Sequence, residues 1–125
     1  MPYDRDDVVG RVIAAAIEVH RELGPGLLES AYELCLCHEL AERQIPFRRQ
    51  VALPVVYKGQ ALDCEYRIDV IVADELILEL KSCDAIHPLH EAQLLTYLKL
   101  SGLHVGLILN FNVPLLKLGI KRMVL

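Results

Sequence analysis

The chain has 125 residues, 54% of them hydrophobic and 24% charged, and its formal net charge is −4. This composition excludes a disordered chain and indicates one sizeable core, so we expect residues 1–125 to form a single domain. The acidic balance argues against a protein that holds nucleic acid by bulk electrostatics. No apolar stretch is long enough to span a bilayer, and the acidic start is unlike a signal peptide, so we expect a cytoplasmic protein without membrane contact.

The first third of the chain has the periodicity of helices. Apolar residues recur at spacings of three and four over residues 6–23, which predicts an amphipathic helix. Gly24-Pro25-Gly26 should end this helix. A second helix is expected at about 27–43, before Ile45-Pro46.

From Val51 onward the pattern becomes extended. Apolar residues alternate over 51–57, and Lys58-Gly59-Gln60 has the composition of a turn. Two further strands are expected at 61–73 and 76–82. Three consecutive strands therefore follow the two helices.

The last third returns to a helix and then to strands. Pro88 should open a third helix over 88–101, and the dense apolar run 105–111 indicates a buried central strand. A last short strand is expected at 118–124. The order of elements predicts an α/β fold in which helices flank a mixed sheet.

The cysteines do not suggest a disulfide framework. They are Cys35, Cys37, Cys64 and Cys83. Without a CxxC pair, we expect reduced and mostly buried thiols. Cys83, His87 and His90 could form a zinc site, but a fourth ligand is missing and Pro88 lies between the histidines. The two histidines also fit surface positions at the start of the third helix.

Three charged residues interrupt apolar strands. Asp69 lies within the run 66–72, and Glu79 and Lys81 lie within the strand expected at 76–82. Burying such groups costs several kcal/mol unless they are paired or bound to a metal. Alternation places Glu79 and Lys81 on one face of their strand and leaves the other face wholly apolar. Taken alone, the pair also fits an edge strand with a solvated ion pair.

The spacing of Asp69 and Glu79 gives a test of register. Residues directly opposite in an antiparallel pair project to the same face. For these two acids to be opposite, residue 74 must be the centre of the hairpin, which requires an odd loop such as Ala73-Asp74-Glu75 or a bulge. A two-residue turn would place Val70 opposite Glu79 and direct Asp69 to the other face.

In the odd register the acids could share a divalent cation. Asp69 and Glu79, with a main-chain carbonyl near Leu80, would offer the hard oxygen ligands that suit Mg²⁺ or Mn²⁺. Lys81, one pleat further along, could position or help deprotonate a water at the metal. Carboxylates that bind a metal and a nearby lysine are the groups that metal-assisted phosphodiester hydrolysis requires.

This constellation resembles the PD-(D/E)XK nuclease superfamily. Asp69 corresponds to the motif aspartate and Glu79-Leu80-Lys81 to the E-x-K element, while Ile68 stands where the proline of the name would be. Gly26-Leu27-Leu28-Glu29-Ser30-Ala31-Tyr32 is similar to the signature of the small bacterial and archaeal GxxExxY proteins. Gln93-Leu94-Leu95-Thr96-Tyr97 resembles the Q-x-x-x-Y element of the exonuclease-like branch.

The resemblance extends over residues 8–124, since 106–111 and 120–122 are similar to the C-terminal end of the GxxExxY proteins. It implies a restriction-endonuclease-like core and a Mg²⁺-dependent nuclease that acts on DNA rather than RNA. Nucleic acid would be the partner, reached directly or through another protein. The catalytic residues it implies are Asp69, Glu79, Lys81, Glu29, Gln93 and Tyr97. Asp69, Glu79 and Glu29 would bind the metal.

The helical residues of this set also have simpler interpretations. Glu29 and Tyr32 share one helix face, but a glutamate there is also favoured by the helix dipole. Gln93 and Tyr97 share a face of the third helix and could bond a phosphate, or form an ordinary polar pair on an amphipathic helix.

Two other functions remain open. A non-catalytic interaction or assembly domain could keep the fold, and the apolar segment 113–116 with the leucine-rich third helix could support a homodimer. A small-molecule metalloenzyme or zinc protein could use Cys83, His87 and His90. The fold alone does not decide among them.

Overall fold

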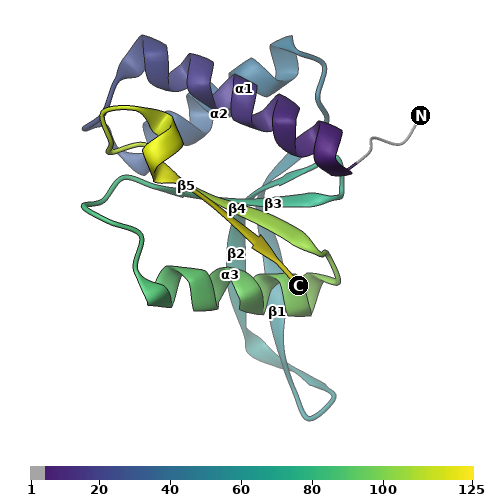
Figure 1. The fold of residues 1–125 in the computed structure, drawn as a ribbon. Coiled ribbons are helices and arrows are strands. Elements are labelled where there is room, and N and C mark those ends of the chain that lie inside the picture. The colour runs from purple at the N-terminus through teal and green to yellow at the C-terminus, as the bar shows by residue number, and fades with distance from the viewer. Residues whose placement is uncertain (1–4) are drawn as a thin grey trace.

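Helices cover both faces of one mixed sheet (Figure 1). The structure, a computed structural model, describes residues 5–125. The helices are α1 (Arg5–Leu23), α2 (Glu29–Glu42) and α3 (Pro88–Ser101), with a short 3₁₀ helix η1 (Leu116–Gly119). The strands are β1 (Phe47–Tyr57), β2 (Gln60–Val72), β3 (Leu76–Lys81), β4 (Val105–Asn110) and β5 (Ile120–Val124). The α/β fold expected from the sequence is confirmed.

The sheet follows the order of the chain. The strands lie in the order β1-β2-β3-β4-β5, and only β3 and β4 are parallel. A parallel pair needs a crossover, which α3 provides. The residues of β4 are all buried, and those of β3 are buried except for half-buried Lys81, as expected of strands covered on both faces.

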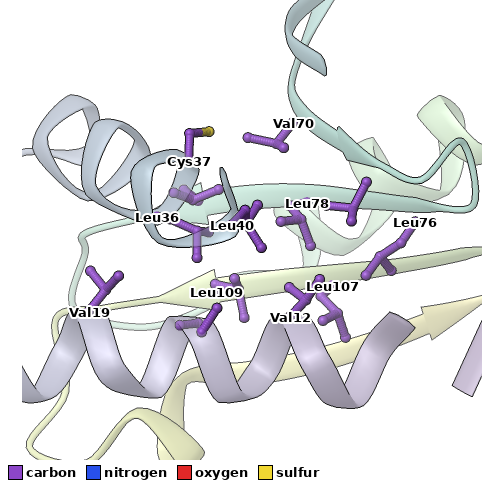
Figure 2. Close-up of a cluster of buried hydrophobic side chains, with 14 of the residues drawn as sticks. Val12, Val19, Leu36, Cys37, Leu40, Val70, Leu76, Leu78, Leu107 and Leu109 are labelled. Carbon is purple, nitrogen blue, oxygen red and sulfur yellow. The ribbon is translucent and has the colours of Figure 1, made fainter. Parts of the chain in front are cut away.

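Two cores lie on opposite faces of the sheet. The larger one packs α1 and α2 against the sheet, and Figure 2 shows Val12, Leu36 and Leu40 beside Leu78 and Leu107. The smaller one packs α3 against the other face. The apolar face expected for β3 therefore belongs to the larger core, and the face that carries its charged residues belongs to the α3 side.

Most element boundaries agree with the sequence, and the third helix does so residue for residue. β1 begins at Phe47 rather than at residue 51. Its first residues include Arg48 and Arg49, whose charges are paired with those of Asp74 and Glu33. The last strand begins at residue 120 rather than 118, because η1 occupies the preceding residues.

The expectation of mostly buried cysteines is wrong. Only Cys37 is buried, and burial raises the pKa of its thiol to about 11. Cys64 is exposed on the long β2 strand, and the other two are half-buried. All four are free thiols in the described structure. No helix within residues 5–125 has the length and apolar character needed to cross a membrane.

Candidate active site

The hairpin between β2 and β3 has the odd register that the sequence predicts. Val72 pairs with Leu76 and Val70 with Leu78, so the centre of the hairpin is residue 74 and three residues form the loop. Ala73 and Asp74 both have positive φ values, and Glu75 donates its main-chain N–H to Val72 at 3.0 Å. Asp69 and Glu79 are the next positions of this register.

At Asp69 the main-chain pairing of β2 with β3 ends, and a hydrogen bond from the β3 backbone to the Asp69 side chain takes its place. The carboxylate Oδ2 of Asp69 accepts the main-chain N–H of Leu80 at 2.9 Å. Ile68 and Ile71 both face the α3 core, whereas Val70 faces the other core, so the alternation of β2 is interrupted at this point. The opposing strand is also irregular, because Gln50 has a φ of 50°, in the left-handed region. The irregularity places Asp69 against β3.

Glu79 is buried with an unsatisfied oxygen. The residue is only 5% exposed, and its Oε1 has no hydrogen-bond partner within the described residues. Burial, then the charge of Asp69, raises the pKa of Glu79 to about 8. Burial also raises the pKa of Asp69, although the bond from Leu80 opposes this. Two desolvated carboxyls lie together, an arrangement that a positive charge would stabilise.

Lys81 supplies positive charge at the same point. It is half-buried, and its charge lowers the pKa of both Asp69 and Glu79. The described part of the chain shows no ion pair for Lys81 within 4.0 Å, so its ammonium is not committed to one carboxylate. The alternative of an edge strand with a solvated ion pair is excluded, because β3 is an inner strand and Glu79 is buried.

The start of α2 brings Glu29 to the end of β3. Glu29 Oε2 accepts the main-chain N–H of Ser82 at 3.4 Å, and the Ser82 hydroxyl donates to Leu27 O at 2.6 Å. The hydroxyl of Tyr32 donates to Gly24 O at 2.5 Å and accepts the N–H of Leu27 at 3.1 Å. The tyrosine thus holds the loop before α2, and the helix start carries Glu29 to within electrostatic range of both site carboxyls.

α3 contributes from the opposite side. Tyr97 is 4% exposed, and burial, then the charges of Glu79 and Asp69, raises its pKa to about 12. Gln93 is half-buried and lines a hollow together with Tyr66 and His90. The structure places Tyr97 beside the carboxyls and Gln93 one turn earlier on α3, towards the hollow.

The comparisons with known proteins agree with this geometry. A family model described as the PD-(D/E)XK nuclease superfamily matches residues 6–123. The chain belongs to the PD-(D/E)XK nuclease superfamily. No curated protein and no solved structure matches it.

Membership in the superfamily makes a divalent metal the relevant cofactor class, and the site carboxyls fit one. The carboxylates of Asp69 and Glu79 are hard oxygen ligands, and the free Oε1 of Glu79 is buried where a cation would offset its charge. Within residues 5–125 no three His, Cys, Asp or Glu side chains are placed to hold a metal together. A cation at Asp69 and Glu79 would therefore need main-chain or solvent oxygens as further ligands, and Glu29 is not placed as a third side-chain ligand within the described residues.

The lack of a three-ligand cluster in the described residues also leaves the zinc site of Cys83, His87 and His90 without support. His87 and His90 are in ring contact at 5.3 Å, but they serve the start of α3, where His90 Nδ1 accepts the main-chain N–H of His87 at 3.2 Å. Cys83 Sγ donates to Ala85 O at 3.2 Å. The three residues do not form a metal cluster within the described chain.

Glu33 is the site residue that the sequence analysis missed. It is 6% exposed, accepts two bonds from Arg49 and one from Gln50 at 2.8–3.1 Å, and raises the pKa of Asp69 through its charge. Its bond to Gln50 anchors the irregular position of β1. The one available signal was its spacing of four from Glu29, which places both acids on the same face of α2.

Proposed function

We propose that this superfamily member is a Mg²⁺- or Mn²⁺-dependent nuclease that cleaves DNA, and that residues 1–125 form one catalytic domain. The observation that carries the proposal is the pair formed by half-buried Asp69 and buried Glu79: both pKa values are raised, and Oε1 of Glu79 has no hydrogen-bond partner in the described residues. Such a pair is costly for folding and useful for holding a cation.

The roles of the central residues follow from their positions. Asp69 and Glu79 would hold the cation, with the main-chain carbonyl of Leu80 as a further oxygen. The cation would supply Lewis-acid stabilisation of the phosphate and lower the pKa of water. Lys81, as an ammonium, would orient the attacking water and offset the negative charge that develops on the phosphate, while the proton of that water leaves to solvent. The lack of an ion pair within the described chain leaves Lys81 able to do so.

The remaining proposed residues act from the two helices. Glu29, at the start of α2, would bind an outer water of the cation and fix the end of β3 through Ser82. Tyr97 would remain protonated at neutral pH, because its pKa is raised to about 12, and its hydroxyl could then donate to a phosphate oxygen. Gln93 would contact the nucleotide next to the scissile phosphate.

We also propose that the chain is of the GxxExxY type. Gly26 has a φ of 94°, which favours glycine, and Tyr32 ties the following loop to the start of α2. Glu29 lies between them and reaches β3. The three motif positions would thus have one joint purpose, which is to hold Glu29 at the site.

The test is metal-dependent cleavage of single-stranded and double-stranded DNA and of RNA. We expect cleavage of DNA with Mg²⁺ or Mn²⁺ that EDTA abolishes and that Lys81→Ala or Asp69→Asn reduces by at least about 100-fold, the scale expected when a catalytic group is lost. Lys99→Ala and Asp63→Asn, at exposed positions of α3 and β2, are the matched controls. Absence of cleavage with either metal, or full activity of Lys81→Ala, would refute the proposal.

A specific observation also supports the assembly function, although the expected segment 113–116 is exposed only in part because Leu116 is buried. Leu115 and Leu118 are 56% and 64% exposed on and beside η1, and Val124 and Leu125 are exposed nearby in the chain. Of the α3 leucines that were expected to contribute, Leu94 and Leu98 are buried against the sheet and are not part of this surface. A homodimer through this surface would be detected by light scattering and weakened by Leu118→Glu. A monomer at all concentrations would exclude it.

A further inference from the structure

A hollow of about 320 Å³ lies between β2 and the first half of α3. Its walls are Tyr66, Leu89, His90, Ala92, Gln93 and Thr96. It adjoins the candidate active site, because Tyr66 contacts Tyr97 and because the charges of Lys81 and Glu29 reach His90. Its volume corresponds to about ten water molecules, which is enough for a planar heterocycle.

One wall of the hollow is aromatic and apolar. Tyr66 is half-buried, and its ring lies 5.5 Å from that of Tyr97 with a tilt of 60°. Leu89 is 76% exposed and adds apolar surface to the same hollow. A flat ligand could stack on the tyrosine and cover the leucine.

The other wall carries side chains that retain unused hydrogen-bonding capacity. His90 Nδ1 accepts the main-chain N–H of His87, so in the neutral ring the proton is on Nε2, which is then a donor. The side-chain amide of Gln93 has no hydrogen bond within the described residues, and it can donate and accept at once. The Thr96 hydroxyl donates to Ala92 O, which leaves its lone pairs as acceptors.

We propose that this hollow binds one unpaired nucleobase of single-stranded nucleic acid and thereby places the adjacent phosphodiester at Asp69, Glu79 and Lys81. The inference rests on the proposed nuclease function and gives it a substrate class. Stacking on an aromatic side chain contributes to the affinity for an unpaired base, and an amide beside an imidazole N–H matches the polar edge of a base.

The charge of the protein favours a single strand over a duplex. Affinity for duplex DNA comes largely from lysine and arginine set against phosphates, and this chain has a net charge of −4. A base held inside a duplex cannot enter a hollow without being unstacked. A site that relies on one stacked base therefore selects ends, flaps or other single-stranded segments.

The experiment measures binding in metal-free buffer, where cleavage does not occur. Short fluorescent single-stranded DNA, single-stranded RNA of the same sequence and the DNA duplex are titrated with the whole protein. A second series of strands lacks one base at each position in turn. The variants are Tyr66→Leu, which removes the aromatic wall, and Ala92→Leu, which fills the hollow from an exposed helix position. Tyr57→Leu, at the exposed far end of β1, is the matched control.

We expect a single strand to bind more tightly than the duplex, and we expect one abasic position to weaken binding to the wild type by about 10-fold. That abasic penalty should vanish in both hollow variants and persist in Tyr57→Leu. Weaker binding caused by one abasic position supports the proposal, whether it is seen in DNA, in RNA or in both. The nucleic acid that binds more tightly is then the natural strand.

An equal abasic penalty in the wild type and in both hollow variants would overturn the inference, as would preference for the duplex. Because Ala92→Leu changes an exposed side chain, the result does not depend on whether Tyr66→Leu folds. The binding assay needs no metal and no cleavage, so failure of the hollow is distinct from failure of the nuclease proposal, which Lys81→Ala tests in Mg²⁺.

Discussion

The clearest physical consequence of the candidate site is a loss of stability at high pH in the absence of metal. Glu79 has a folded-state pKa of about 8 against an ordinary value of 4.5, first because it is buried and then because Asp69 is close. A carboxyl whose pKa rises on folding favours the folded state most at low pH, and this contribution declines once the unfolded state begins to lose its proton. Its contribution is therefore complete below pH 4.5 and is lost as the pH rises towards 8.

The size of this effect can be worked out from the pKa values. Each pKa unit corresponds to about 1.4 kcal/mol, so a rise from 4.5 to about 8 lowers the free energy of unfolding by about 5 kcal/mol in total. About 4 kcal/mol of this loss falls between those two pH values, because the carboxyl is half titrated in one of the two states at each limit. The pKa of Asp69 is raised as well, which adds to the loss in the same direction. A small domain has a total stability of about 5–15 kcal/mol, so the loss is easily measured.

The assay is urea unfolding in EDTA at several pH values from 4.5 to 8. We expect wild type and Glu65→Gln, an exposed control on β2, to lose stability with rising pH, and Glu79→Gln to lose much less, since its amide does not ionise. Added Mg²⁺ should restore wild-type stability at pH 8 more than at pH 5, because it binds the ionised site. An identical pH slope in wild type and Glu79→Gln would refute the reasoning.

Three further predictions concern the support of the site. Tyr32→Phe removes the hydroxyl that ties the loop before α2, so we expect a loss of about 1–3 kcal/mol in chemical unfolding and slower DNA cleavage. Glu33→Gln leaves Arg49 without its counter-charge and should cost about 1–3 kcal/mol, with cleavage reduced even where circular dichroism shows an intact fold; unchanged cleavage would contradict its positioning role. Gly119→Ala would place a Cβ 2.0 Å from the main-chain oxygen of Asn110, so we expect a lower melting temperature than for Gly10→Ala, whose Cβ meets no atom within 4 Å.

The hairpin at the site could be predicted because its constraint is local. Two acids ten residues apart can face each other only about residue 74, and the pleat then decides which face every neighbour takes. The structure has this register and a three-residue loop. The same logic placed Leu76, Leu78 and Leu80 together in a core.

Long-range pairing explains what the sequence did not reveal. The sequence at the start of β1 is polar, which does not predict a strand. Arg48 and Arg49 are accommodated there because they pair with Asp74 in the β2–β3 loop and with Glu33 in α2. Glu33 looked like any helix-surface glutamate until the fold brought Gln50 against it. The burial of Glu79 likewise depends on β4 and α3, which follow it in the chain, so the edge-strand interpretation could not be excluded in advance.

The surroundings of β3 explain how one charged side chain can remain uncommitted in a crowded site. Glu29 accepts the N–H of Ser82, and Asn110 clamps the next residue, Cys83, by donating to its carbonyl at 3.0 Å and accepting its N–H at 3.2 Å. The carbonyl of Lys81 itself accepts the main-chain N–H of Phe111, the residue after β4, at 2.9 Å. Because the backbone is held from α2 and from β4, the ammonium of Lys81 is not needed for local structure. Under the proposed function its charge would be available to a substrate phosphate, which is the role that Lys81→Ala tests.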